Sequence, residues 1–140
     1  MSELASKSSD GERLPGLPAL IMSDLRAKAL WVYGSVSAKT ILKTLLTDGT
    51  FAMIAYRKMQ WCQRHKLYPL AMIFNKLNGF FGRCIIGRNA WFGPGFVIVH
   101  SYGVVINTSV RGGRNIRLEH GVTIGAEKGQ SPVLGDDVFV

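Results

Sequence analysis

The sequence predicts an α+β protein, in which a helical region, residues 17–82, precedes a parallel β-helix, residues 83–140. Two observations lead to this fold class. Apolar residues recur at helical spacing in the N-terminal part and at every sixth position in the C-terminal part. A period of six fits neither a helix nor an alternating strand, but it fits a short strand followed by a tight corner. Three such hexapeptides would form one coil of a triangular prism.

The hexapeptide repeat contains two apolar columns and one column of small residues. The first apolar column comprises Ile86, Phe92, Ile98, Ile106, Leu118, Ile124, Leu134 and Val140. The second lies four residues further on and comprises Ala90, Phe96, Val110, Ile116, Val122 and Val138. The residue after the first column is small or tolerates a turn, as at Gly87, Gly93, Asn107, Gly113, Glu119, Gly125 and Gly135. We expect the apolar columns to stack inside the prism, with coils about 4.8 Å apart.

The repeat is irregular at three places. Gly112 stands where the first column requires an aliphatic residue. The step from Ile98 to Ile106 is two residues longer than a hexapeptide, and the step from Ile124 to Leu134 is four longer. Added residues in a solenoid form loops, and such loops often carry function. The third coil ends in mid-repeat with an uncovered edge, so we expect either a truncated copy of a longer protein or another chain that covers this edge.

Four helices are expected between a polar arm, residues 1–16, which is predicted to be disordered, and the β-helix. Their limits follow from caps and helix breakers: Leu17 to Gly34, Ser37 to Gly49, Phe51 to about His65, and Pro69 to Asn78-Gly79. The second helix has an apolar stripe of Ile41, Leu42, Leu45 and Leu46, and the fourth has one of Leu70, Ile73, Phe74 and Leu77. The third is expected to bury Phe51, Ile54, Ala55, Tyr56, Trp61 and Cys62.

The net charge of +8 is concentrated in the helical region. Residues 1–83 carry 12 basic and 5 acidic residues, whereas residues 84–140 carry 5 and 4. The basic cluster Arg57, Lys58, Arg64, His65 and Lys66 is interpreted as a solvated face, with anionic lipid as a less favoured partner. No nucleic-acid-binding motif accompanies it, so no nucleic acid is expected as a partner.

Cys62 and Cys84 lack metal-ligand spacing, and the N-terminus lacks an apolar signal segment. Reduced thiols and a cytoplasmic location are therefore expected.

The sequence contains no phosphate-binding P-loop, no metal-ligand cluster and no nucleophile elbow, which leaves the histidines as candidate catalytic groups. His65 lies in the basic cluster and is expected at the surface. His100 lies in the enlarged corner between Ile98 and Ile106, and His120 lies about one coil further along. By spacing alone, a structural role is favoured over catalysis for each of them.

One pattern changes that weighting. The runs Phe92 to His100, Gly103 to Asn107 and Gly121 to Gly125, with Tyr56-Arg57 and Trp61 before them, resemble the serine acetyltransferases. These are hexapeptide-repeat acyltransferases with a left-handed parallel β-helix, and they use acetyl-CoA as co-substrate and no metal. The resemblance covers roughly residues 50–140. It implies that His100 is the general base, that backbone amides at Gly125 and Ala126 contact acetyl-CoA, and that the cleft lies between subunits of a homotrimer or a dimer of trimers.

Three departures from the family pattern concern the acceptor. The aspartate expected fifteen residues before the histidine is Ile85, the aspartate directly before it is Val99, and the Arg-His pair before Pro132 is Gln130-Ser131. These changes favour an acceptor hydroxyl on a sugar or exopolysaccharide unit over L-serine. Glu119 or a carboxylate of another subunit could orient His100, and His120 lies nearby.

Two function classes therefore remain. The first is an acetyl-CoA-dependent O-acetyltransferase. The alternative is a catalytically silent β-helix module that assembles with, or regulates, a longer relative, which the departures from the pattern favour. Peripheral membrane contact through the basic helices is a minor third possibility.

Overall fold

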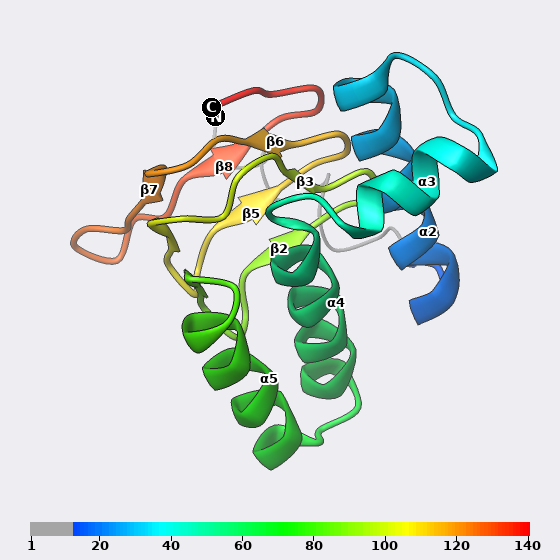
Figure 1. The fold of residues 1–140 in the computed structure, drawn as a ribbon. Coiled ribbons are helices and arrows are strands. Elements are labelled where there is room, and N and C mark those ends of the chain that lie inside the picture. The colour runs from blue at the N-terminus through cyan, green and yellow to red at the C-terminus, as the bar shows by residue number, and fades with distance from the viewer. Residues whose placement is uncertain (1–12) are drawn as a thin grey trace.

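The structure is a computed structural model that describes residues 13–140, so most of the predicted arm, residues 1–16, lies outside the described residues. The described helices are α2 (Leu17–Tyr33), α3 (Ala38–Leu45), α4 (Thr50–Arg64) and α5 (Tyr68–Phe80). Helices α4 and α5 form a hairpin at the end of the stack, next to the first coil, and α2 lies beside the edges of the coils (Figure 1). The helices thus cover the first coil and one side of the stack.

Eight short strands form three parallel sheets. They are β1 (Cys84–Ile86), β2 (Trp91–Phe92), β3 (Val97–Ile98), β4 (Val104–Ile106), β5 (Arg111–Gly112), β6 (Arg117–Leu118), β7 (Thr123–Ile124) and β8 (Val133–Leu134). Their order is β1-β4-β7 in one sheet, β2-β5-β8 in the second and β3-β6 in the third. A bridge from Arg117 to Phe139 extends the third sheet into the next coil. The predicted parallel arrangement of repeating short strands is confirmed.

The strand register confirms the two insertions. Val105 pairs with Thr123, and the step between them matches three plain hexapeptides. The step from Cys84 to its partner Val104 is longer, because it includes the insertion that holds His100. The step from Arg111 to its partner Val133 is the longest, because it includes the insertion that follows Gly125. Both insertions lie at corners, and the sheets on either side keep their pairing.

Both apolar columns line the interior of the first two coils. Ile86, Phe96, Ile106, Ile116 and Leu118 are at most 1% exposed. Burial decreases in the third coil, where Leu134 and Val138 are half-buried and Val140 is 45% exposed. Val140 keeps the register of the buried Leu118, because Arg117 pairs with Phe139, and it is exposed because no described residue covers the far side of this coil.

Gly112 is explained by the ring next to it. A Cβ atom at this position would lie 2.4 Å from Cδ1 of Phe92. The Phe92 ring stacks on that of Phe96, with centroids 4.3 Å apart and planes inclined by 16°. The aromatic pair fills the space that an aliphatic residue at 112 would otherwise occupy.

Two predictions for the helices were wrong. The second helix ends at Leu45, and Gly49, with φ of 79°, is the N-cap of α4 instead of the stop of α3. The apolar stripe of α3 is largely exposed, because Thr44 is its buried residue. Most of the α5 stripe is also exposed, and so is Phe51 on α4. Helical spacing identified these stripes correctly but could not show which of them the β-helix covers.

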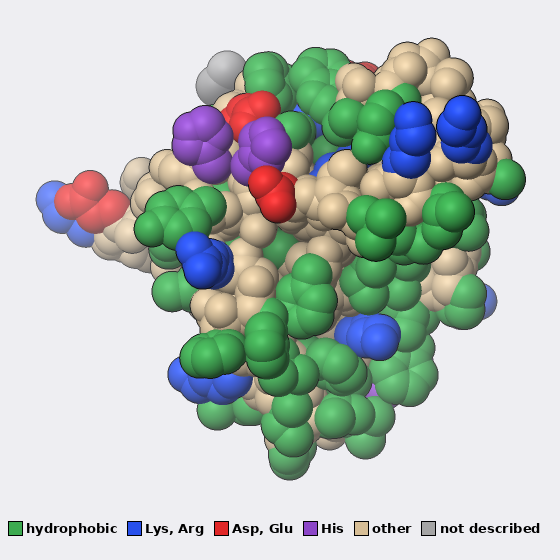
Figure 2. Space-filling view, viewed as in Figure 1, with side chains coloured by type: hydrophobic (Ala, Val, Ile, Leu, Met, Phe, Trp, Pro, Cys, Tyr) green, Lys and Arg blue, Asp and Glu red, His purple; other side chains and the backbone are tan. Residues whose placement is uncertain are grey.

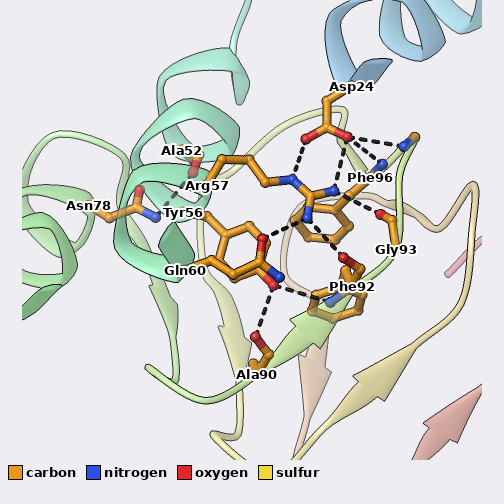
Figure 3. Close-up of polar contacts among 11 residues, drawn as sticks. Asp24, Ala52, Tyr56, Arg57, Gln60, Asn78, Ala90, Phe92, Gly93 and Phe96 are labelled. Carbon is orange, nitrogen blue, oxygen red and sulfur yellow. Dashed lines mark hydrogen bonds and ion pairs between the residues drawn. The ribbon is translucent and has the colours of Figure 1, made fainter. Parts of the chain in front are cut away.

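Arg57 corrects the interpretation of the basic cluster, because it is fully buried. Its Nε donates to Asp24 Oδ2 at 2.6 Å, and its Nη2 donates to Asp24 Oδ1 at 3.0 Å. Its other N–H groups donate to Gln60 Oε1 and to the carbonyls of Phe92 and Gly93 (Figure 3). Asp24 also accepts from the amides of Gly95 and Phe96. This buried network joins α2 and α4 to a corner of the first coil.

Helix α2 contacts successive coils along one of its faces. Asp24 bonds to the first coil, and the Lys28 ammonium donates to the carbonyl of Ile98 at the end of β3. Trp31 packs under the guanidinium of Arg117 in the second coil and against Phe139 in the third. Asp24 and Lys28, one turn apart, therefore both hold the first coil, and Trp31 further along the helix contacts the second and third coils.

Candidate functional site

His100 lies at an open corner of the prism. It follows β3 directly after Val99, and its side chain is 53% exposed. The corner is held by backbone hydrogen bonds from the Gly103 amide to Arg83 and from the Gly121 amide to Tyr102. Beside it is a cleft of about 360 Å³, lined by Thr47, Asp48, Gly49, Phe51, Phe81, Gly82, Arg83, His100, Ser101 and Tyr102. The imidazole can therefore meet a small molecule that enters the cleft.

Asp48 is the carboxylate next to His100. Its Oδ2 lies 3.3 Å from His100 Nδ1, although the two residues are 52 positions apart in the chain. Asp48 belongs to the turn between α3 and α4, and sequence reasoning missed it. The available signal was the sequence Thr47-Asp48-Gly49 ahead of a helix, which reads as an ordinary turn.

The turn that carries Asp48 is held in place from both sides. The hydroxyls of Thr47 and Thr50 donate to the Thr44 carbonyl at 2.8 and 2.6 Å. The buried Lys28 ammonium donates to the Asp48 carbonyl as well as to that of Ile98, at 2.9 Å for Ile98. Burial lowers the pKa of Lys28 to about 8, and the Asp48 charge opposes that shift. A Cβ atom at Gly49 would lie 2.3 Å from the Ile98 oxygen, so the close approach requires glycine.

Glu119 and His120 form a second acid and histidine pair one coil away. Glu119 Oε2 lies 3.3 Å from His120 Nδ1. The rings of His100 and His120 have centroids 6.3 Å apart. Figure 2 shows two neighbouring histidine side chains with acidic side chains on either side. The structure thus brings His100, His120 and Glu119 to one corner, with Glu119 beside His120 and Asp48 beside His100.

Gly125 and Ala126 lie at a different corner. They follow β7, and the β1-β4-β7 sheet separates their corner from that of His100. Three strand residues at about 3.3 Å each place these corners roughly 10 Å apart. A Cβ atom at Gly125 would meet no atom within 4 Å, so the space beside this turn is open. A single chain therefore holds the candidate base and the candidate coenzyme turn apart, at opposite edges of one face.

The two cysteines and His65 were also considered as candidate functional groups. Both Cys62 and Cys84 are free and buried, and burial raises the pKa of Cys84 to about 12. His65 is exposed and packs edge-on to Trp61. Within residues 13–140, no group of three His, Cys, Asp or Glu side chains is arranged to hold a metal ion. The helices in this range are also too short or too polar to cross a membrane.

The three stacked sheets of two- and three-residue strands define the chain as a hexapeptide-repeat protein. Serine acetyltransferases from Bacillus pumilus and Helicobacter pylori are 34% and 33% identical to it over 109 and 100 residues, or 74% and 69% of the chain. The soybean serine acetyltransferase, in a structure with serine, covers 97% of the chain at 28% identity with a TM-score of 0.76. No protein-family model matches. The chain is serine acetyltransferase-like in sequence and fold, as its motifs predicted.

The matched regions are only part of each relative. They make up 50% of the Bacillus pumilus protein, 58% of the Helicobacter pylori protein and 55% of the soybean chain. The chain thus spans little more than half the length of the proteins it resembles.

Proposed function

We propose that this chain acts in acetyl transfer from acetyl-CoA to a hydroxyl group, with His100 as the general base. The observation that carries the proposal is the position of His100: a half-exposed imidazole at the edge of a cleft, with a carboxylate at its Nδ1. A hydrogen bond from Nδ1–H to Asp48 leaves Nε2 free to accept a proton. The relatives, which are named serine acetyltransferases, support the reaction class.

The reaction needs one proton to be moved twice. Nε2 of His100 accepts the proton of the acceptor hydroxyl as the oxygen attacks the thioester carbonyl. The carbon–sulfur bond then breaks, and the imidazolium returns the proton to the departing thiolate of CoA. Backbone amides are suited to stabilise the negative oxygen formed in between, and the open turn at Gly125 and Ala126 is the candidate site for the thioester arm.

The acceptor proposed here is L-serine, which corrects the expectation of a sugar or exopolysaccharide unit. The relatives reported above are named for serine, and the soybean structure contains it. Ile85, Val99 and Gln130-Ser131 still lack the polar contacts of the family pattern. The cleft itself supplies Arg83, whose guanidinium can pair with the carboxylate of an amino acid.

We further propose that the β-helix is left-handed and that the active unit is a homotrimer or a dimer of trimers. Support for the assembly comes from the separation of His100 from Gly125 within one chain. A neighbouring copy in a closed ring would bring its Gly125 corner toward the His100 corner of the first.

The test is an acetyl-transfer assay on the purified protein with acetyl-CoA, following release of the CoA thiol. L-serine is compared with glycerol, a neutral acceptor, and His100→Gln is compared with wild type. His65→Gln is the matched control, because His65 is exposed and lies away from the cleft. We expect L-serine-dependent thiol release that falls at least about 100-fold in His100→Gln alone. Equal rates in wild type and His100→Gln would exclude His100 as the base.

Ile85 and Val99 favour a second candidate, a catalytically silent assembly module. Both replace charged residues of the family pattern with aliphatic ones, and Ile85 is 57% exposed where a polar residue would be expected. Calorimetric titration with acetyl-CoA separates the two functions. Binding with measurable turnover supports the enzyme, whereas stable assembly without any acetyl-CoA binding supports the module.

A further inference from the structure

We propose that Asp48 is the positioning residue for His100, so that the helical region, and not the β-helix, supplies the carboxylate that orients the base. This inference rests on the proposed function of His100. Its evidence is the 3.3 Å contact between Asp48 Oδ2 and His100 Nδ1. Because Nδ1 then carries the proton, the neutral ring presents an unprotonated Nε2 to the cleft.

Lys28 binds the backbone on both sides of the Asp48–His100 contact. The Lys28 ammonium donates to the carbonyl of Asp48 and to that of Ile98, which lies two residues before His100. A single buried cation on α2 therefore fixes the turn that holds the acid and the strand end that holds the base. Gly49 allows the two segments to approach, since any Cβ atom there would meet the Ile98 oxygen. Buried groups thus hold the backbone segments of Asp48 and His100 next to each other.

The other carboxylates within residues 13–140 contact groups other than His100. Glu119 lies beside His120, and Asp24 is buried against Arg57. Asp136 accepts from the Arg114 amide, and Asp137 accepts from Asn115, both at another corner of the prism. Glu127 lies beside Lys128 in the four-residue insertion. Asp48 is therefore the carboxylate that the fold presents to His100.

Exposure limits what the contact can do. The Asp48 side chain is 82% exposed and that of His100 is 53% exposed, so water screens their attraction. The contact is expected to add little to stability. Its effect is orientation: it holds the ring in one rotamer and one tautomer, which affects the rate of proton transfer and not the folding of the chain.

The first experiment reads the tautomer directly. Long-range proton–nitrogen NMR spectra of the full chain distinguish a neutral histidine that is protonated at Nδ1 from one protonated at Nε2. His100 is assigned by the loss of its signals in His100→Gln. We expect the Nδ1–H form in wild type and a shift toward the Nε2–H form in Asp48→Asn, while Glu119→Gln changes only His120. This readout does not depend on activity.

The second experiment measures acetyl transfer in the same variants, with His65→Gln again as the surface control. We expect Asp48→Asn to lower kcat by roughly 10-fold to 100-fold and Asp48→Glu to recover part of that loss, because the carboxylate is restored. Circular dichroism of each variant checks that the fold is retained. A purely structural role for Asp48 would not produce the tautomer shift.

The outcomes separate this inference from the proposed function. If His100→Gln is as active as wild type, His100 is not the base, whatever the Asp48 spectra show. If His100 is required but Asp48→Asn keeps both the tautomer and kcat, Asp48 is not its positioning residue. A tautomer shift in Glu119→Gln at His100 would assign the role to Glu119 instead and overturn the inference.

Discussion

Arg57 uses every donor of its guanidinium inside the protein: two bonds go to Asp24, one to Gln60 and two to carbonyls of the first coil. A buried ion pair of this kind adds little net stability compared with an apolar pair, because both charges lose their hydration. Removing one partner is different, since the other charge is then left buried without compensation. The network therefore specifies how the helices sit on the β-helix.

Arg57→Met is expected to lower the free energy of unfolding by about 3–5 kcal/mol, because Asp24 keeps its burial and loses its counter-charge. Urea denaturation monitored by circular dichroism measures this change. Lys58→Met is the matched control, because Lys58 is adjacent but exposed, and it should change stability by less than about 1 kcal/mol. Similar small effects for both variants would contradict the structural role of Arg57.

Lys28 makes stability depend on pH. Its folded pKa is about 8 and its ordinary value is 10.5, so between these values the unfolded chain binds the extra proton and stability rises with pH. Cys84 opposes this trend because its pKa is raised to about 12 from 9.0. The difference between wild type and Lys28→Met cancels the cysteine contribution.

That difference in unfolding free energy should increase in favour of wild type by up to about 3 kcal/mol from pH 8 to pH 10.5. Below pH 8 the gain is lost. Urea titrations of both proteins at half-unit pH steps provide the measurement. Parallel curves for the two proteins across this window would show that Lys28 is not held by burial as described.

Sequence reasoning proposed His100 as the base, misjudged Arg57 and missed Asp48. The insertion in the regular repeat drew attention to His100, and the resemblance to the serine acetyltransferases gave it the role of the base. Arg57 and its exposed neighbour Lys58 are both basic residues in the same basic cluster, so the sequence does not tell them apart. Arg57 is buried in the fold because α2 places Asp24 next to its guanidinium. Asp48 meets His100 across 52 residues, a contact that no local pattern encodes.

At the scale of elements, the strands were more predictable than the packing of the helices. Each strand in a solenoid pairs with the equivalent strand of the next coil, which has the same hexapeptide pattern. One periodic pattern therefore predicts which strands pair, in which register, and which side chains face the interior. The second helix shows the opposite case. Its stripe from Ile41 to Leu46 has helical spacing, yet Leu42 and Leu46 are 63% and 87% exposed. Which face of a helix is covered depends on the neighbouring element.

Gly112→Ala tests the aromatic packing inside the prism. The new methyl group would overlap the Phe92 ring, which is stacked on Phe96 and cannot move freely, so a loss of about 1–3 kcal/mol in stability is expected. Gly135→Ala is the matched control, because its Cβ atom would have no neighbour within 4 Å. Thermal unfolding of the two variants gives the comparison. Equal stability would mean that the ring does not occupy this space.

At the scale of the whole molecule, α2 joins the helices and the coils into one cooperative unit. Asp24 and Lys28 contact the first coil, and Trp31 contacts the second and third coils. Unfolding of any coil would expose part of this helix face. Separate melting of the helical region and the β-helix is therefore not expected.

A protein with Trp31→Phe and Trp61→Phe retains Trp91 in β2 as a probe of the β-helix. Its fluorescence and the helical signal at about 222 nm should give coincident urea transitions. Wild type followed by circular dichroism controls for the two substitutions. Two transitions separated in midpoint would show that the helices and coils fold independently.

The unequal lengths of the coils have a consequence for how such proteins can be altered. Length changes are confined to two corners, one holding His100 and the other following Gly125, while strand pairing on the adjoining faces continues unchanged. Either corner can therefore change in length while the stack of strands stays the same. A corner transferred from a relative should therefore leave the strand pairing of the remaining coils intact.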